Sequence, residues 1–180
     1  MQKPYIQPPR RIVTGHNASG RSIILHDGPA PTCLQPDHSP NVMMCDLWEL
    51  TALPPNNEDE RDTSLRPLRL SPPADGAIFR IVEFPPDSQR NWAARKEVFA
   101  QYGEAHALGE KEERHPGFHK TPSLDFAVLL EGEIWAMMEE GETLLRPGDT
   151  VVQRGTNHAW ANRSERPARM AFVMMGAPAL

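Results

Sequence analysis

Two stretches of the chain decide its fold: HKTPSLDFAVLLEG at residues 119–132 and RPGDTVVQRGTNHAWAN at residues 146–162. Each contains a short run of β-branched and other apolar residues beside a turn signal, Glu131-Gly132-Glu133 in the first and Pro147-Gly148 in the second. A third run, ARMAFVMM at residues 168–175, follows another turn-rich segment. Short strands separated by tight turns from Gly117 onward predict an all-β sandwich or barrel.

The residues before Gly117 predict more strands and one helix. Alternating or apolar runs at 42–50 and 79–84 have strand composition, and residues 10–28 form two β-branched runs around the turn signal at 17–20. The helix is expected between Asn91 and Gly109, where Trp92, Phe99 and Tyr102 share a broad apolar stripe. Three further segments complete these expectations: an extended arm at 1–10, an exposed loop at 54–73 and a single strand at 150–160.

Composition and charge exclude several classes of protein. The 180 residues carry 19 Lys and Arg against 24 Asp and Glu, and this net charge of −5 gives no attraction to nucleic acid or anionic membranes. No apolar run approaches the roughly 20 residues of a membrane span, and the first residues lack a secretory signal. We interpret Cys33 and Cys45 as small apolar residues without a disulfide role, which favours a reducing, cytoplasmic compartment.

Four side chains in the β region are candidates for chemistry: His115, His119, Asp125 and His158. Imidazole and carboxylate are the usual ligands of Fe, Mn, Ni and Zn, and two histidines with one carboxylate leave open positions on the metal. Their spacing alone does not show that they meet, and each histidine has the alternative of being an ordinary turn residue.

The two stretches resemble the conserved motifs of the cupin superfamily. Gly155, His158 and Asn162 match the Gly-x2-His-x3-Asn end of its second motif, while His119 and Asp125 occupy the histidine and glutamate places of its first. Residues 117–173 are similar to the small cupin-2 type barrels, especially a bacterial and fungal subgroup with H-x-T…D and QRGT-x-HAW patterns. We therefore expect a cupin double-stranded β-helix, or jelly-roll barrel, at 76–180, with an N-terminal β extension at 1–75 and one main helix.

The resemblance implies a site for one divalent transition metal (Fe, Mn, Ni or Zn) held by His119, Asp125 and His158. The chain departs from the family in lacking a second histidine two positions from His119. His115 is a candidate for a fourth ligand or an acid/base, and Lys120 for a residue that moves a proton or pairs with a carboxylate.

Other residues are candidates to bind a substrate inside the barrel. Thr156, Trp160 and Asn162 share the face of His158 by the period of two in a strand. Arg154 is expected to orient an anionic substrate and Trp135 to line the barrel, with surface exposure and core filling as the respective alternatives.

We predict a metal-dependent cupin enzyme acting on a small organic acid or a polyketide-like or aromatic molecule, as oxygenase, decarboxylase, dehydratase or isomerase. The alternative is a barrel that binds or senses a small molecule without metal or catalysis. Because cupins commonly pair through N-terminal strands, a homodimer is expected, with no nucleic-acid or membrane partner.

Overall fold

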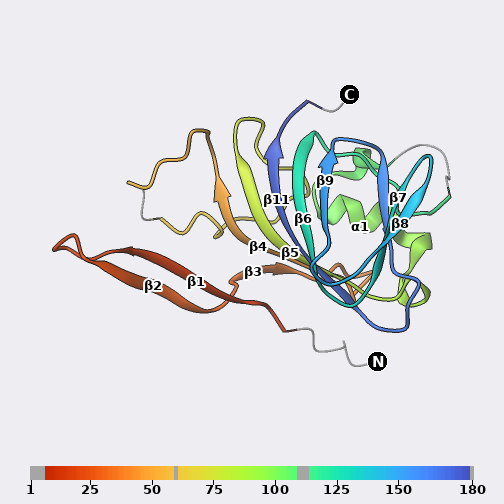
Figure 1. Ribbon diagram of the computed structural model, residues 1–180, viewed down its shortest axis with the longest axis horizontal. Coiled ribbons are helices and arrows are strands. Elements are labelled where there is room, and N and C mark those ends of the chain that lie inside the picture. Colours follow the sequence, from red (N-terminus) through yellow and green to blue (C-terminus); the bar gives the residue numbers. More distant parts are fainter. Residues whose placement is uncertain (1–6, 59–60, 109–113, 179–180) are drawn as a thin grey trace.

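Strands are the main regular structure of the computed structural model, which describes residues 7–58, 61–108 and 114–178 (Figure 1). In chain order they are β1 (Arg10–His16), β2 (Ser22–Pro29), β3 (Thr32–Leu34), β4 (Met43–Leu50), β5 (Ala77–Phe84), β6 (Ser123–Glu131), β7 (Ile134–Met138), β8 (Glu142–Leu145), β9 (Thr150–Arg154), β10 (His158–Ala161) and β11 (Ala168–Gly176). The all-β prediction is confirmed.

Two sheets enclose the core. The larger has the order β3-β4-β5-β11-β6-β9 and the smaller the order β10-β7-β8. The main hydrophobic cluster joins Val82 and Leu129 of the larger sheet to Ile134 and Trp160 of the smaller one. The sheets are therefore the two walls of one barrel, with the helix α1 packed between them (Figure 1).

Strand β6 shows how the sequence pattern aims side chains into this barrel. Ser123, Asp125, Ala127 and Leu129 are buried, whereas Phe126 between them is exposed. Successive side chains of a strand point to opposite faces, so this alternation places Asp125 on the inner face.

The single strand predicted at 150–160 is wrong, because the chain changes sheets within it. Strand β9 ends at Arg154 and pairs with β6, whereas β10 begins at His158 and pairs with β7. Gly155 lies between them with a φ of 61°, a left-handed conformation that glycine adopts without strain. This turn carries the chain from the larger wall to the smaller one.

The helix predicted between Asn91 and Gly109 is present only in part: the α-helix is limited to residues 95–101. Three helical pieces occupy this segment: η2 (Trp92–Ala94), α1 (Arg95–Gln101) and η3 (Ala105–Ala107), after an earlier 3₁₀ turn, η1 (Asp87–Gln89). Gly103, with a φ of 74°, ends the helix, while Gly109 lies outside the described residues. None of the described helices has the length and apolarity needed to cross a bilayer.

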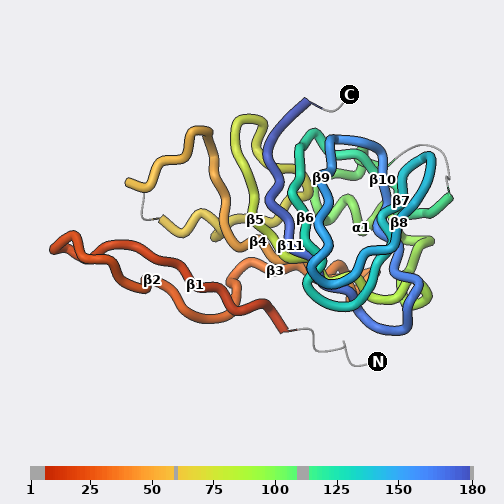
Figure 2. The backbone as a smooth tube through the Cα atoms, viewed as in Figure 1, coloured from red at the N-terminus to blue at the C-terminus, as the bar shows by residue number. Residues whose placement is uncertain are grey.

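The N-terminal part combines a projecting hairpin with strands of the main sheet. Strands β1 and β2 form the predicted hairpin, which extends away from the two sheets (Figure 2). The short β3 and the predicted β4 join β5 in the larger sheet. The division at residues 75 and 76, which falls between β4 and β5, stays a prediction, and most of the predicted arm lies outside the described residues.

The exposed loop predicted at 54–73 is only half correct. Residues 54–58 are exposed, but Leu70 and Ser71 are buried and Arg66 forms salt bridges with Asp46 and Glu49. The charges of this second half are therefore partners of the sheet, which the composition alone did not indicate.

The cysteine interpretation is wrong. Cys33 on β3 and Cys45 on β4 are directly opposite in the antiparallel register and form a disulfide, with their Cα atoms 4.1 Å apart. Prolines on both sides of Cys33 favour a loop at 29–36, so neither β3 nor this pairing is predicted from the sequence. The argument from unpaired cysteines to a reducing compartment therefore fails.

Candidate functional site

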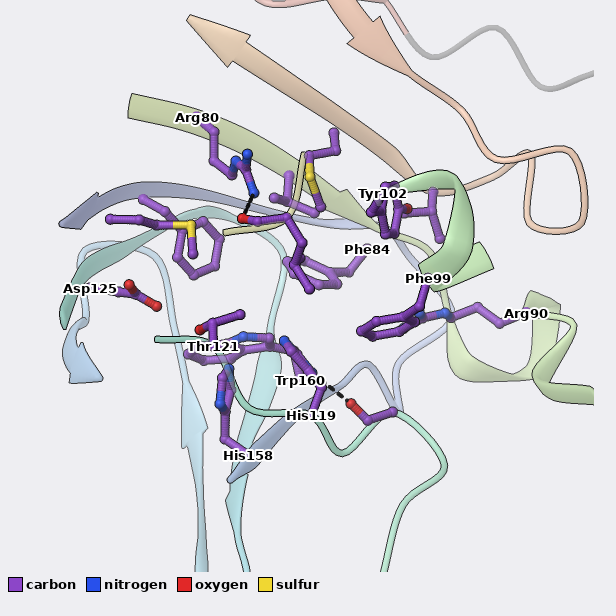
Figure 3. Close-up of a pocket in the computed structure, with 17 residues that line it drawn as sticks. Arg80, Phe84, Arg90, Phe99, Tyr102, His119, Thr121, Asp125, His158 and Trp160 are labelled. Atoms are coloured by element: carbon purple, nitrogen blue, oxygen red, sulfur yellow. Dashed lines mark hydrogen bonds between the residues drawn. The ribbon is translucent and has the colours of Figure 1, made fainter. Parts of the chain in front are cut away.

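A pocket opens between the two sheets and is closed on one side by the helical segment (Figure 3). Its walls are mostly apolar and aromatic, with a few polar side chains. The residues that line it are Val42, Met44, Leu70, Arg80, Val82, Phe84, Arg90, Phe99, Tyr102, Gly117, His119, Thr121, Asp125, His158, Trp160, Phe172 and Met174. A concave apolar site with a few convergent polar groups is typical of a small-molecule pocket.

His119 and His158 are held together by the backbone. Each donates its N–H to the carbonyl of the other, at 2.9 and 3.0 Å, in an isolated antiparallel bridge that adds His119 to the edge of β10. Their ring centroids lie 4.5 Å apart. Phe99 of α1 packs edge-on against His119 at 5.3 Å, and Trp160 against His158 at 5.6 Å.

Both imidazoles are neutral in this environment. Burial, together with a smaller contribution from the neighbouring His119, lowers the pKa of His158 to about 3. Burial also lowers the pKa of His119, with a smaller contribution from the positive charge of Arg90. Two adjacent imidazoles in an apolar pocket therefore remain unprotonated at neutral pH.

Hydrogen bonds determine which ring nitrogens are free. Nδ1 of His119 lies 2.9 Å from the carbonyl oxygen of Gly117, an acceptor, so Nδ1 carries the proton and Nε2 keeps its lone pair. Nδ1 of His158 lies 2.9 Å from both the carbonyl of Thr156 and the amide nitrogen of Gln153. If Nδ1 of His158 carries the proton, it donates to the Thr156 carbonyl. If Nε2 carries the proton, Nδ1 accepts from the Gln153 amide, so either tautomer has a partner at Nδ1.

Asp125 faces the same pocket from the larger sheet. Its Oδ1 is buried and has no hydrogen-bond partner among the described residues. Burial raises the pKa of this carboxyl to about 6, although the Ser123 hydroxyl and Arg80 act in the opposite direction.

The predicted metal site is not assembled. Asp125 lies apart from the two histidines (Figure 3), and the described residues contain no group of three or more His, Cys, Asp or Glu placed to hold a metal ion. The histidine pair supplies two nitrogen donors, but the carboxylate does not complete the set. The residues present therefore do not fit the three-ligand metal site that the resemblance implied.

Comparisons with known proteins agree with the motif resemblance, although no family model matches the chain. Phomopsin biosynthesis cluster protein D of Diaporthe leptostromiformis is 30% identical over 98% of this chain and 82% of its own. The cupin-domain-containing oxidoreductase fogC of Aspergillus ruber is 26% identical over 92% of this chain and 71% of its own.

The chain belongs to the cupin superfamily. Among solved structures, the cupin domain of Cnp3 from Schizosaccharomyces pombe aligns over 96% of this chain and 89% of its own, with 11% identity and a TM-score of 0.44. The cupin barrel here is the pair of facing sheets described above, and the two motif histidines lie on its inner surface.

Of the residues predicted to bind a substrate in the cupin barrel, one lines the pocket and four do not. Trp160 lines the pocket. Thr156 and Arg154 are exposed, and Trp135 packs outside the pocket, where Arg163 lies over its ring at 4.8 Å. Asn162 is buried away from the pocket, and its amide donates to the carbonyl of Phe84 at 2.9 Å. Thr156 does not share the inward face of His158 because Thr156 lies in the turn after Gly155, before β10 begins, where side chains do not alternate as in a strand.

The two predicted catalytic residues do not line the pocket. His115 lies 3.1 Å from a carboxylate oxygen of Asp87, and its Nδ1 accepts the N–H of Gly117 at 3.0 Å. Since Gly117 in turn accepts from His119, His115 is a positioning residue for that ring. Lys120 is half-buried, next to Thr121, which takes the inward place.

The sequence reasoning missed the polar side chains on the opposite side of the pocket. Arg80 comes from β5, while Arg90 and Tyr102 come from the ends of the helical segment. Tyr102 had been assigned to an apolar stripe, and no motif or spacing marked the arginines. Only the tertiary packing of this segment against the barrel brings them to the histidines.

Proposed function

We propose that this cupin is an enzyme that acts on a small organic molecule between its two sheets, with His119 and His158 as the proton-transferring side chains. The observation that carries the proposal is the pair of adjacent, neutral imidazoles in a mostly apolar pocket. Desolvated acid and base groups that line a concave site are typical of catalytic centres.

The roles follow from the hydrogen bonds. His119 presents a lone pair on Nε2 and accepts a proton from the substrate. The same proton is returned to the product, either by the His119 imidazolium itself or by His158 after it takes the proton from the adjacent ring, so both imidazoles end neutral again. Decarboxylation, dehydration and isomerisation all need such a transfer.

The names of relatives support small-molecule chemistry. FogC of Aspergillus ruber and srdB of Neurospora crassa are named cupin-domain-containing oxidoreductases, and the Diaporthe relatives are named for phomopsin biosynthesis. We therefore extend to this chain an enzymatic role on a biosynthetic small molecule, an organic acid or a polyketide-like or aromatic compound.

Catalysis by a bound metal, as predicted from the sequence, is the alternative to proton transfer by the histidines. Because the described residues do not fit a three-ligand site, no step is assigned to a metal. Turnover that survives dialysis against EDTA supports side-chain proton transfer. Turnover that is lost to EDTA and restored by Fe, Mn, Ni or Zn places the chemistry on a metal instead.

The deciding experiment is a substrate search with a matched inactive protein. The wild type and a His119→Gln/His158→Gln variant are each incubated with a small-molecule extract of the producing cells and followed by mass spectrometry. We expect compounds that only the wild type consumes. A compound that binds both proteins and is never converted would favour the non-catalytic binding or sensing module.

A further inference from the structure

The pocket contains polar atoms that the proton-transfer pair does not use. Nε of Arg90 and the hydroxyl of Tyr102 are both buried and have no hydrogen-bond partner among the described residues. Tyr102 is only 4% exposed, and both residues line the pocket. Buried polar groups of folded proteins almost always have partners, so these two atoms, with Oδ1 of Asp125 as a third in the same cavity, favour a polar ligand in the pocket.

The second arginine of the pocket provides a comparison within the same cavity. Arg80 donates to the Asp46 carboxylate at 2.9 Å and to the carbonyls of Leu70 and Arg69. Its charge is therefore neutralised inside the protein.

Arg90 is in a different situation. Its guanidinium carbon lies 3.9 Å from the centroid of the Trp92 ring, and no described carboxylate forms a salt bridge with it. Asp87, the acidic residue nearest in sequence, directs Oδ2 to His115 instead. Asp87 therefore acts on Arg90 only through a longer-range attraction, without a salt bridge or hydrogen bond. A half-buried guanidinium whose hydrogen-bond donors are not taken by a carboxylate favours an anionic ligand.

The remaining walls define the body of that ligand. Aromatic rings from both sheets and from α1 surround the space: Trp160 lies 5.7 Å from Phe172, Phe172 lies 6.5 Å from Phe84, and Phe99 contacts His119. Such walls accommodate an aromatic or other apolar body.

We propose that Arg90 and Tyr102 bind the carboxylate of an aromatic or similarly apolar organic acid, whose body lies among the aromatic rings of the pocket. The guanidinium and the phenol hydroxyl both donate hydrogen bonds to the carboxylate. Arg90 and Phe99 lie on the side of the pocket opposite Asp125 (Figure 3), and Phe99 packs against His119, so the body of the acid extends from Arg90 toward His119. This assignment rests on the proposed function, since it names the substrate class of the same pocket.

The test compares acids with neutral amides of the same shape. Isothermal titration calorimetry measures binding of benzoate and 2-naphthoate against benzamide and 2-naphthamide. We expect the wild type to bind at least one acid about ten-fold or more tightly than its amide. Arg90→Gln removes this preference by weakening the acid alone, Arg90→Lys keeps part of it, and Tyr102→Phe reduces it. The matched control Arg146→Gln, an exposed arginine outside the pocket, leaves it unchanged.

The outcomes separate this inference from the proposed function. Equal affinity for acid and amide, or a preference that survives Arg90→Gln, overturns the anion assignment and leaves the enzyme proposal standing. Absence of binding by all four compounds overturns the assignment, while the enzyme proposal is decided separately by the substrate search with the histidine double variant. If the histidine double variant loses turnover but still binds the acid, both the enzyme proposal and the anion assignment are supported. The comparison of acid with amide in the wild type does not depend on whether any variant folds.

Discussion

His119 and His158 exchange both of their backbone hydrogen bonds, and their imidazole rings consequently lie 4.5 Å apart on the inner surface of the barrel. The two residues are far apart in the sequence, and this bridge brings their backbones side by side. The pair is thus fixed by the backbone and not by side-chain packing alone, which suits a site that must keep two bases at a constant separation.

The first prediction concerns the protonation of this pair. Because burial lowers the pKa of both rings, and that of His158 to about 3, we expect both to be neutral at pH 7, His158 to stay neutral at pH 5, and His119 to titrate below the ordinary histidine value. Ring-nitrogen NMR, with assignments from His119→Gln and His158→Gln, measures this directly. A titration midpoint near the unperturbed value of about 6.5 for either ring would contradict it.

Asp125→Asn is expected to change the pH dependence of stability. The folded-state pKa of about 6 lies above the unfolded value of about 3.9, so the wild type loses stability as pH rises from about 4 through 6. The loss is on the order of 2–3 kcal/mol, and asparagine, which has no charge to bury, avoids it. Urea unfolding should therefore show the variant more stable than the wild type at pH 8 and nearly equal at pH 4. Asp75→Asn, at an exposed position, is the control, and a variant destabilised equally at both pH values would refute the expectation.

The sequence predicted the pocket residues that lie in the two motifs, but not those that the helical segment contributes. His119, Asp125 and His158 were predicted because they occupy the ligand positions that the resemblance to the cupin motifs implies, and these motifs adjoin turns at Gly132 and Gly155. Whether the carboxylate meets the histidines was not predictable, because that distance depends on how two sheets face each other. Arg90 and Tyr102 gave no signal. Arg90 follows the 3₁₀ turn η1 and Tyr102 follows the seven-residue helix α1, and only tertiary packing brings both to the pocket.

Reduction of the Cys33–Cys45 disulfide should destabilise the protein. The bond closes a short loop between β3 and β4, with a sequence separation of 12 residues, and such a closure stabilises by about 2–3 kcal/mol. Urea unfolding with and without dithiothreitol measures the difference, and a Cys33→Ala/Cys45→Ala variant should not respond to the reductant. Two free thiols in the oxidised, denatured protein would show that the bond is absent.

The outer face of the larger sheet is expected to bind a second copy of the chain. Phe79, Val173, Phe126 and Val152 are direct cross-strand neighbours on β5, β11, β6 and β9, and they are 39–58% exposed. The next row, Ile81, Ala171 and Val128, is also apolar. Contiguous apolar surface of this kind marks an interaction site, and a flat sheet face is self-complementary about a two-fold axis. We therefore propose a homodimer joined through this face.

Light scattering after gel filtration tests this dimer. At micromolar concentration the wild type should have twice the 20.2 kDa mass of the chain, and Phe126→Lys should shift it to the monomer mass. The shift is expected because a lysine in the middle of the row would bury an unpaired charge at the interface, whereas in the monomer the same side chain is solvated. Leu65→Lys, at a 66% exposed apolar position outside the sheet, provides the matched control and should remain dimeric. A monomeric wild type would refute the dimer, and a dimer that tolerates Phe126→Lys would move its interface to another face, with the projecting β1–β2 hairpin as the next surface to vary.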